Sequence, residues 1–397
     1  MRILVHDYGG YPFCLELSRE IAARGHQVQH VFFPAACTSI HNMDARASDP
    51  ATLKIVPLGT ELQYAKYASL FRRRAQEIAY GRRLGAHIAE WKPDIVLSAN
   101  APLDVQRRAI AASHAIKARF TFWLQDIISV AMSVILKERL GAAGALVARY
   151  YRMVEADIAR RSDSVIAIAE DFLPVLKCWN VASERCHVIE NWAPKDDIHP
   201  GSKDNSWSRA NGLHDKHVLL YSGRLGFKHN PKLLLALAEE FRTDPNVIVL
   251  VIAEGQGADW LAEQKTLRDL PGLQQMPFQP YAELSNALAS GDVLICIIEQ
   301  SAHLYSVPSK ILSYLAAGRA ILAAMPEDNV NAQHIARVQA GLVVPPERPD
   351  AAIDAARRLL ANESIRARYA GNARRYAEEA FDIQSITDRF LKILLRT

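Results

Sequence analysis

Cysteine is scarce in this sequence of 397 residues. The five cysteines (Cys14, Cys37, Cys178, Cys186 and Cys296) are odd in number, lie far apart and form no CxxC pair. This spacing indicates neither a disulfide framework nor a zinc site. A reducing cytoplasm is therefore the compartment that the cysteine content favours.

Long apolar runs are also missing. Nowhere do about 18 uncharged apolar residues follow one another, and the amino end, MRILVHDYGG, reads as a strand without the apolar core of a signal peptide. We therefore expect a cytoplasmic protein with no segment that spans a membrane. The net charge is only +4, although basic residues are locally clustered, and this balance argues against a protein devoted to nucleic acid.

Two motifs that would indicate a cofactor or a metal are absent. No GxGxxG fingerprint follows the first apolar run, and no DxD follows an aliphatic strand. The adjacent pair Asp196-Asp197 lies in a polar stretch, where it is more typical of a solvated linker than of a ligand pair. We therefore expect no metal site and no bound cofactor.

Short apolar runs that alternate with helical patterns fill most of the chain. Half of the residues are hydrophobic, and the length fits two or three domains of about 150 residues. Alternation of this kind predicts parallel sheets covered by helices on both faces, which is the doubly wound α/β class. It is interrupted between Asn191 and His217 by a stretch rich in Pro, Gly, Asn and Ser, which predicts a domain boundary.

The stretch Val218 to Pro231, VLLYSGRLGFKHNP, combines a strand, a glycine turn and a helix start. Arg224 and Lys228 stand after the turn at Gly223, just before the apolar helical pattern. Free backbone N–H groups, the helix dipole and two cations together favour a diphosphate. The alternative is a solvated cationic loop, since one glycine turn is weak evidence.

A second glycine turn, Gly9-Gly10, follows the first strand of the chain. In a doubly wound domain, ligands meet the loops at the carboxyl ends of the strands. The pair is therefore a candidate for close approach of a substrate, and a simple tight turn is the alternative.

Several stretches occur in an order that resembles the family 4 retaining glycosyltransferases of the GT-B fold, and within them bacterial surface-polysaccharide enzymes. The stretches are HDYGGYPFCLELSREIAARGH, WLQD, VIENWAP, YSGRLGFKHNP, MPFQPYAELSNALASGDVLI and SVPSKILSYLAAGRAIL. The resemblance covers nearly the whole chain. It implies two Rossmann-like domains that face a cleft: an acceptor domain (residues 1–195) and a nucleotide-sugar domain (residues 196–380). A last helix, about residues 381–397, would return to the first domain.

The resemblance also implies a donor site in the second domain. Gly223 would let the protein backbone come close to the donor, and Arg224 and Lys228 would hold the donor diphosphate. The loop that begins at Phe278 would take the nucleobase. A second donor loop contributes Glu299, which either contacts the donor sugar or is a solvated carboxylate. Val307, Ser309 and Lys310 complete that loop, where a helix start forms a second anion site.

The chain departs from the family pattern at two places. Tyr305 and Ser313 occupy the positions of two glutamates spaced E-x7-E, which puts ribose recognition in doubt. Gln125 stands where many relatives have a histidine before an acid. A neutral amide cannot act as a base, so Asp126 is the candidate for binding or deprotonating the acceptor hydroxyl. Its alternative role is to cap the helix that follows.

The resemblance implies transfer of a sugar, with retention, from a nucleotide-diphosphate donor such as a UDP-sugar to a polyprenyl-linked glycan. The acceptor side would use Gly9, Gly10 and Asp126. Two alternatives stay open: a nucleotide-sugar epimerase or hydrolase, and a non-catalytic subunit that binds nucleotide.

The stretch Glu61 to Arg83 interleaves aromatic residues with Lys66, Arg72, Arg73 and Arg74. It predicts either peripheral association with an anionic membrane surface or an ordinary helix whose apolar face packs on the sheet.

Overall fold

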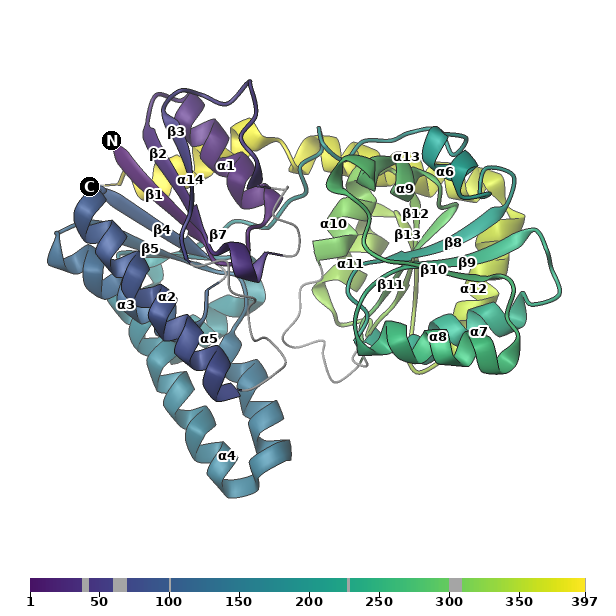
Figure 1. The fold of residues 1–397 in the computed structure, drawn as a ribbon, viewed down its shortest axis with the longest axis horizontal. Helices are drawn as coiled ribbons and strands as arrows, with labels where there is room; N and C mark the ends of the chain where they lie inside the picture. The colour runs from purple at the N-terminus through teal and green to yellow at the C-terminus, as the bar shows by residue number, and fades with distance from the viewer. Residues whose placement is uncertain (38–42, 60–69, 100, 227–228, 300–308, 397) are drawn as a thin grey trace. The chain divides into compact units, whose positions relative to one another are not determined.

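The computed structural model describes residues 1–37, 43–59, 70–99, 101–226, 229–299 and 309–396 (Figure 1). Lys228 and Val307, two of the residues predicted to bind the donor, lie outside these ranges. The chain divides into two compact units, residues 1–191 with 383–397 and residues 192–382. Each unit is built on one parallel sheet, as the alternation of short strands and helices predicts.

The sheet of the first unit has seven parallel strands in the order β3-β2-β1-β4-β5-β6-β7. The strands are β1 (Arg2–Asp7), β2 (Gln27–Phe32), β3 (Leu53–Pro57), β4 (Ile95–Ala99), β5 (Arg119–Leu124), β6 (Ser164–Ala167) and β7 (Cys186–Val188). The helices are α1 (Pro12–Ala23), α2 (Leu70–Trp91), α3 (Leu103–Ala115), α4 (Ile128–Arg161), α5 (Leu173–Cys178) and α14 (Ile383–Leu394). The strand order reverses between β1 and β4, and ligands of open α/β sheets bind at such a switch point.

The sheet of the second unit has six parallel strands in the order β10-β9-β8-β11-β12-β13. The strands are β8 (His217–Ser222), β9 (Val247–Ile252), β10 (Leu273–Met276), β11 (Val293–Ile297), β12 (Ala320–Ala324) and β13 (Gly341–Val344). The helices are α6 (Ser206–Ala210), α7 (Pro231–Glu240), α8 (Gln256–Arg268), α9 (Leu284–Ala289), α10 (Ser309–Ala316), α11 (Val330–Val338), α12 (Pro349–Ala361) and α13 (Glu363–Ala380). Here the order reverses between β8 and β11.

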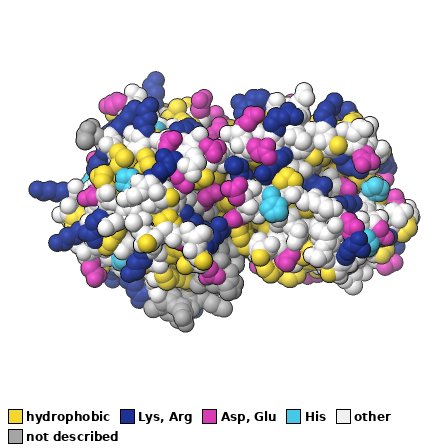
Figure 2. Space-filling model, turned by 90° about the horizontal axis from the view of Figure 1, so that it is seen from above, with side chains coloured by type: hydrophobic (Ala, Val, Ile, Leu, Met, Phe, Trp, Pro, Cys, Tyr) yellow, Lys and Arg dark blue, Asp and Glu magenta, His cyan; other side chains and the backbone are white. Residues whose placement is uncertain are grey.

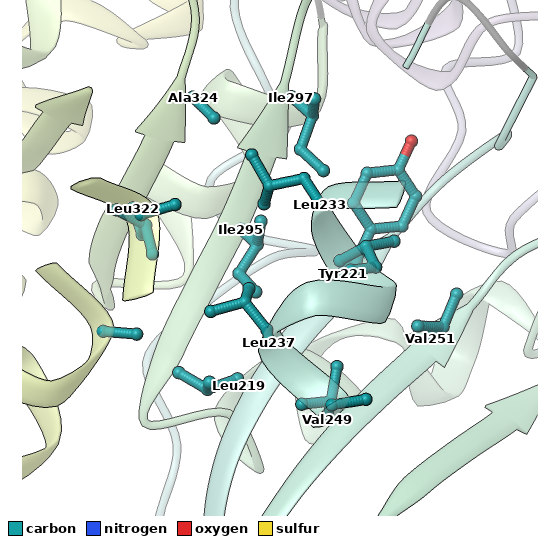
Figure 3. Packing of buried hydrophobic residues seen from close by; sticks show 14 of the residues in the cluster. Leu219, Tyr221, Leu233, Leu237, Val249, Val251, Ile295, Ile297, Leu322 and Ala324 are labelled. Carbon is teal, nitrogen blue, oxygen red and sulfur yellow. The ribbon is translucent and has the colours of Figure 1, made fainter. Parts of the chain in front are cut away.

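Strands covered on both faces explain the apolar runs of the sequence. All six residues of β9 are buried, as parallel strands between two helical layers require. Leu219 and Val249 from the sheet pack with Leu233 and Leu237 of α7 in the core of the second unit (Figure 3). Helix α7 begins at Pro231. The first N–H groups of a helix have no acceptor within the helix, so the missing N–H of proline loses no hydrogen bond there.

The last helix, α14, belongs to the first unit. Phe390 packs edge-on against Trp123 of β5, with ring centroids 4.8 Å apart. Arg24, the residue after α1, forms an ion pair with Asp388 at 2.6 Å, and Arg119 donates to the carbonyl oxygen of Leu394 at 3.1 Å. The predicted return of the carboxy-terminal helix to the first domain is confirmed.

Helix α4 is interrupted at Gly141, whose backbone (φ 53°, ψ −129°) is not helical. The chain folds back there, so the two halves of α4 form an arm on the first unit (Figure 1). Glycine tolerates this conformation because it has no Cβ.

Charged side chains of both signs are interspersed over the face shown in Figure 2. This mixture agrees with the small net charge of +4. Among the residues that the structure describes, no helix combines the length and the apolar composition that crossing a bilayer requires.

Candidate functional site

The turn after β8 has a backbone that only glycine adopts readily. Gly223 has φ +132°, and a Cβ there would lie 3.2 Å from Cε and Nζ of Lys310. Its N–H donates to the carbonyl oxygen of Ile252 at 3.0 Å, which fixes the turn at the end of the sheet. A side chain at this position would therefore strain the backbone and push against Lys310.

Lys310 stands in the first turn of α10, and its ammonium lies beside this turn. Its Nζ is 3.6 Å from the ring centroid of Tyr221, within the range of a cation–π interaction. The hydroxyl of Tyr221 donates to the carbonyl oxygen of Arg224 at 2.9 Å. The structure thus brings together Gly223, Arg224 and Lys310, three of the residues predicted to bind the donor.

Two glycines that the sequence analysis did not select hold the Arg224 loop in place. The N–H of Leu225 donates to the carbonyl oxygen of Glu254, and the N–H of Gly257 donates to that of Leu225, both at 2.9 Å. A Cβ on Gly255 would lie 2.8 Å from the Leu225 carbonyl oxygen, and one on Gly257 would lie 2.9 Å from it. The signal in the sequence is the EGQG stretch directly after an apolar strand.

Tyr314 of α10 is a second residue that the sequence analysis missed. Its hydroxyl accepts a hydrogen bond from the N–H of Ser222 at 3.0 Å and lies 3.2 Å from the carbonyl oxygen of Ile295. Burial raises the pKa of this phenol, so it stays a neutral hydrogen-bonding group. Tyr314 therefore links the end of β8 to the middle of β11 at the switch point.

Three more of the predicted donor residues, Glu299, Phe278 and Ser309, lie after strands or at the start of a helix in the second unit. Glu299 follows β11, and partial burial raises the pKa of its carboxyl, as does the nearby charge of Glu347, while Lys232 lowers it. Phe278 follows β10 and is half-buried. Ser309 is the first residue of α10.

The glycine pair of the first unit is held by a buried carboxylate. Asp7, at the end of β1, accepts hydrogen bonds from the N–H of Gly9 at 3.2 Å and from the N–H of Tyr11. Burial raises the pKa of Asp7 to about 7, although these backbone hydrogen bonds act in the opposite direction. Gly10 has φ +65°, and a Cβ there would lie 2.3 Å from Sγ of Cys37. The turn therefore needs glycine at that position.

A cavity of about 290 Å³ opens beside this turn, within the first unit. Its walls include Gly9 from the β1–α1 turn, Arg73 of α2, Gln106 of α3, and Gln125 and Asp126 after β5. Two of the predicted acceptor residues, Gly9 and Asp126, thus share one wall. Gln106 was not selected from the sequence.

Asp126 is exposed, and another carboxylate accepts N–H groups at the start of α4. Glu155 accepts the N–H groups of Ile128 and Ser129, both at 2.9 Å. Burial raises the pKa of Glu155 to about 7, against the effect of these hydrogen bonds. The capping alternative for Asp126 is therefore taken by Glu155. Next to Asp126, Gln125 accepts a hydrogen bond from Asn191 at 2.6 Å.

Arg73 and Arg74 are engaged within the first unit. Arg73 pairs with Glu77 at 2.7 Å, and Arg74 pairs with Asp104 at 3.0 Å. Arg73 also lines the cavity. Residues 61–69 of the stretch predicted to meet a membrane lie outside the described residues.

His6 of β1 is a buried core histidine. Its Nδ1 lies 2.7 Å from Ser98 Oγ and its Nε2 lies 3.1 Å from Tyr80 Oη. Burial lowers the pKa of His6 to about 3. The folded protein therefore holds this imidazole neutral at every pH above that value.

The buried His6 predicts a pH-dependent stability. As pH falls from 6.5 toward 3, the unfolded chain binds a proton that the folded protein excludes, so stability is lost. His6→Gln removes this loss. Between pH 7.5 and pH 5, we expect the free energy of unfolding of the variant to rise by about 2 kcal/mol relative to the wild type. Urea unfolding of both proteins at the two pH values measures this difference, and a constant difference would contradict the prediction.

Two α/β units with all-parallel sheets, each with its candidate residues at the carboxyl ends of the strands, define the GT-B class of fold. The model of the Glycosyl transferase 4-like domain matches residues 9–192, and that of Glycosyl transferases group 1 matches residues 203–376. The two matches together cover most of the chain, which belongs to the glycosyltransferases that have a 4-like domain followed by a group 1 domain and the GT-B fold. The predicted family and fold class are confirmed.

Relatives of known name agree with this assignment. WcaI of Escherichia coli (strain K12), named as a glycosyl transferase of colanic acid biosynthesis, is 24% identical over 98% of this chain and 99% of its own. The structure of Anabaena Alr3699/HepE with UDP and glucose has a TM-score of 0.73 at 16% identity and full coverage of both chains. WaaG, a glycosyltransferase involved in lipopolysaccharide biosynthesis, has a TM-score of 0.68 at 17% identity over 99% of each chain.

Proposed function

We propose that this glycosyltransferase moves a sugar from a UDP-sugar to a lipid-linked glycan in bacterial surface-polysaccharide synthesis, with retention of configuration. The observation that carries the donor side is the Gly223 turn with Arg224 after it and the Lys310 ammonium beside it. Backbone N–H groups and cations at a strand-to-helix turn favour a diphosphate. HepE, which shares the fold, was solved with UDP and glucose, and this supports a uridine nucleotide.

The chemistry requires negative charge to be stabilised as the nucleoside diphosphate leaves. Arg224 and Lys310 supply positive charge on either side of the Gly223 turn, and Lys228 is expected to add a third cation. Fixed charges that meet the developing charge lower the barrier most, because they need no reorganisation during the reaction.

The acceptor side of the proposal rests on the first unit. Asp126 lines the 290 Å³ cavity, and Glu155 accepts the first N–H groups of the helix that follows it. A positioned carboxylate can bind an acceptor hydroxyl and take its proton. Gln125 beside it is a neutral amide and cannot take that role.

A donor screen tests the proposal. Purified protein is heated with UDP-, GDP-, ADP- and dTDP-sugars, and a donor that binds the folded state raises the unfolding midpoint. The donor that binds is then supplied in radiolabelled form with bacterial membrane extract. Label in the lipid fraction supports the transferase. Isomerised or hydrolysed free sugar nucleotide would instead support an epimerase or hydrolase. Binding of a donor without turnover would support a non-catalytic subunit that binds nucleotide.

We further propose that the transfer needs no divalent metal. Among the described residues, no three His, Cys, Asp or Glu side chains gather as a metal site would require, and arginine and lysine stand at the proposed diphosphate site. Excess EDTA is therefore expected to leave the rate of sugar transfer within about two-fold of the untreated enzyme, since fixed cations supply the electrostatic stabilisation. The rate is measured with and without added Mg²⁺ or Mn²⁺. Strong inhibition that either ion reverses would contradict this expectation.

A lipid-linked acceptor implies contact with a membrane surface, and we propose that the α4 arm makes it. The second half of α4 exposes Leu146 (72%) and Met153 (61%), with Val147 and Tyr150 also exposed. Arg149 and Arg152 are exposed on the same segment. Exposed apolar side chains flanked by cations suit an anionic interface.

The protein is therefore expected to co-sediment with anionic vesicles more than with neutral ones, and less at high salt. Replacing Leu146, Tyr150 and Met153 by serine should weaken binding at least about ten-fold, because even one buried apolar side chain contributes about 1.5 kcal/mol. Leu267→Ser is a matched control, since Leu267 of α8 is 77% exposed. Equal sedimentation of the triple variant and the control would remove α4 from the membrane contact.

A further inference from the structure

Gln106 is a polar side chain on the buried face of α3. It stands one helical turn from Leu103 and from Ile110, both buried, and its own exposed fraction is 0%. Gln106 is nevertheless one of the residues that line the cavity, as is Asp126. The helical spacing thus places an amide among the residues that line the candidate acceptor cavity. An aliphatic side chain would be usual at such a buried position.

Both polar atoms of this amide are buried, and within the part of the chain that the structure describes neither Nε2 nor Oε1 has a hydrogen-bond partner. Other buried amides of the same unit are bonded. Gln29 pairs with His87 at 2.7 Å, and Gln125 accepts from Asn191 at 2.6 Å. An amide buried without partners carries a desolvation penalty, which an apolar side chain of the same size would avoid. A ligand in the cavity that bonds to Gln106 would offset this penalty.

The cavity favours a neutral ligand with several hydroxyl groups. Its charged wall residues include Arg73 and Asp126, of opposite sign, and Arg73 is already paired with Glu77. No net positive charge remains there for a phosphate. Tyr11, which is 41% exposed, adds aromatic surface, which can pack against the apolar face of a sugar ring.

We propose that Gln106 is a specificity-determining residue for the acceptor and bonds two neighbouring hydroxyls of its terminal sugar. The amide presents one donor and one acceptor side by side, and two adjacent hydroxyls can satisfy both. The inference rests on the proposed function, because it names the part of the acceptor that this cavity takes. A site built to bond a hydroxyl rejects the analogue that lacks it, since its buried polar groups are then left unpaired.

Ligand-observed NMR with methyl glycosides of common hexoses and their monodeoxy analogues tests this proposal without any donor. We expect the wild type to bind at least one glycoside and to lose affinity when one of two neighbouring hydroxyls is removed. Gln106→Leu should bind the parent glycoside at least about ten-fold more weakly, which corresponds to about 1.4 kcal/mol, and should no longer distinguish it from the deoxy analogues. Its unfolding midpoint should not fall, because the change replaces an unsatisfied buried amide by an apolar group.

Gln29→Leu is the matched control. It removes another buried amide of the first unit, one that is bonded to His87, so it should lower the unfolding midpoint and leave glycoside binding unchanged. Gln106→Glu is a second variant of nearly the same size, which keeps the acceptor atom and loses the amide donor. It should also bind the parent glycoside more weakly, so the proposal remains testable if Gln106→Leu does not fold.

Two results would overturn the inference: no glycoside binds the wild type, or the Gln106 variants bind and discriminate as the wild type does. UDP affinity, measured by calorimetry on the same samples, separates this failure from failure of the proposed function. If UDP still binds and the Gln106 variants bind glycosides as the wild type does, only the inference about Gln106 is contradicted. If the variants lose glycoside binding but no sample binds UDP, only the proposed UDP-sugar donor is contradicted.

Discussion

Replacing Arg224 by alanine is expected to lower turnover roughly 100- to 1,000-fold while the fold is retained. The side chain is half-buried and follows the Gly223 turn, where the departing diphosphate would gain charge. Its attraction to that charge grows as the glycosidic bond breaks, so its loss should appear chiefly in kcat. Turnover is measured with a radiolabelled donor at saturating concentration, and circular dichroism checks the fold.

Arg242→Ala is the matched control for this prediction. Arg242 belongs to the same unit and forms only a 3.6 Å ion pair with Asp269 on the surface, so its removal should leave kcat unchanged. Lys228→Ala, a substitution chosen from the sequence and outside the described residues, is expected to behave like Arg224→Ala. Turnover like that of the wild type in both site variants would remove this loop from the donor site.

The strands could be predicted from the sequence because a parallel strand buried on both faces must be apolar along its whole length. The run VIVLVI of β9 is short, rich in β-branched residues and bounded by turn signals, and these features favour a buried strand over a buried helix. The turn at Gly223 could be predicted for the same reason, since the apolar run ends there and cations follow. Arg224 could be selected because its distance along the chain from that turn is short.

Contacts between distant loops could not be predicted in the same way. Gly255 and Gly257 matter because the carbonyl oxygen of Leu225 lies where their Cβ atoms would be, and the spacing within one loop carries no information about that approach. Tyr314 looks like one more apolar position of an amphipathic helix until its hydroxyl is seen between Ser222 and Ile295.

The acceptor cavity also depends on elements that are distant in the sequence. Arg73 belongs to a basic stretch for which the sequence predicts either a membrane contact or an ordinary domain helix, and the structure shows that it pairs with Glu77 and lines the cavity. Gln106 did leave a signal, an amide in phase with Leu103 and Ile110 on one helix face. That signal is ambiguous without the cavity, because a glutamine in this phase also fits a helix whose face is only partly buried.

Asp126→Asn is expected to lower turnover roughly 100- to 10,000-fold, the range that a positioned general base contributes. The substitution keeps the size of the side chain and removes its ability to take a proton. The fold should survive, because Asp126 is exposed and Glu155 accepts the first N–H groups of α4 in its place. Donor affinity, measured by calorimetry with UDP, should stay within about two-fold of the wild type, since the donor residues belong to the other unit.

The split between turnover and donor affinity is what identifies the role of Asp126. An acceptor residue that acts in the transition state lowers kcat and leaves UDP binding intact, whereas a donor ligand lowers both. Asp171→Asn, an exposed carboxylate of the same unit, should change neither and so controls for loss of surface charge. A fall in UDP affinity of the Asp126 variant would assign this carboxylate to the donor, and unchanged turnover would show that the acceptor hydroxyl loses its proton without it.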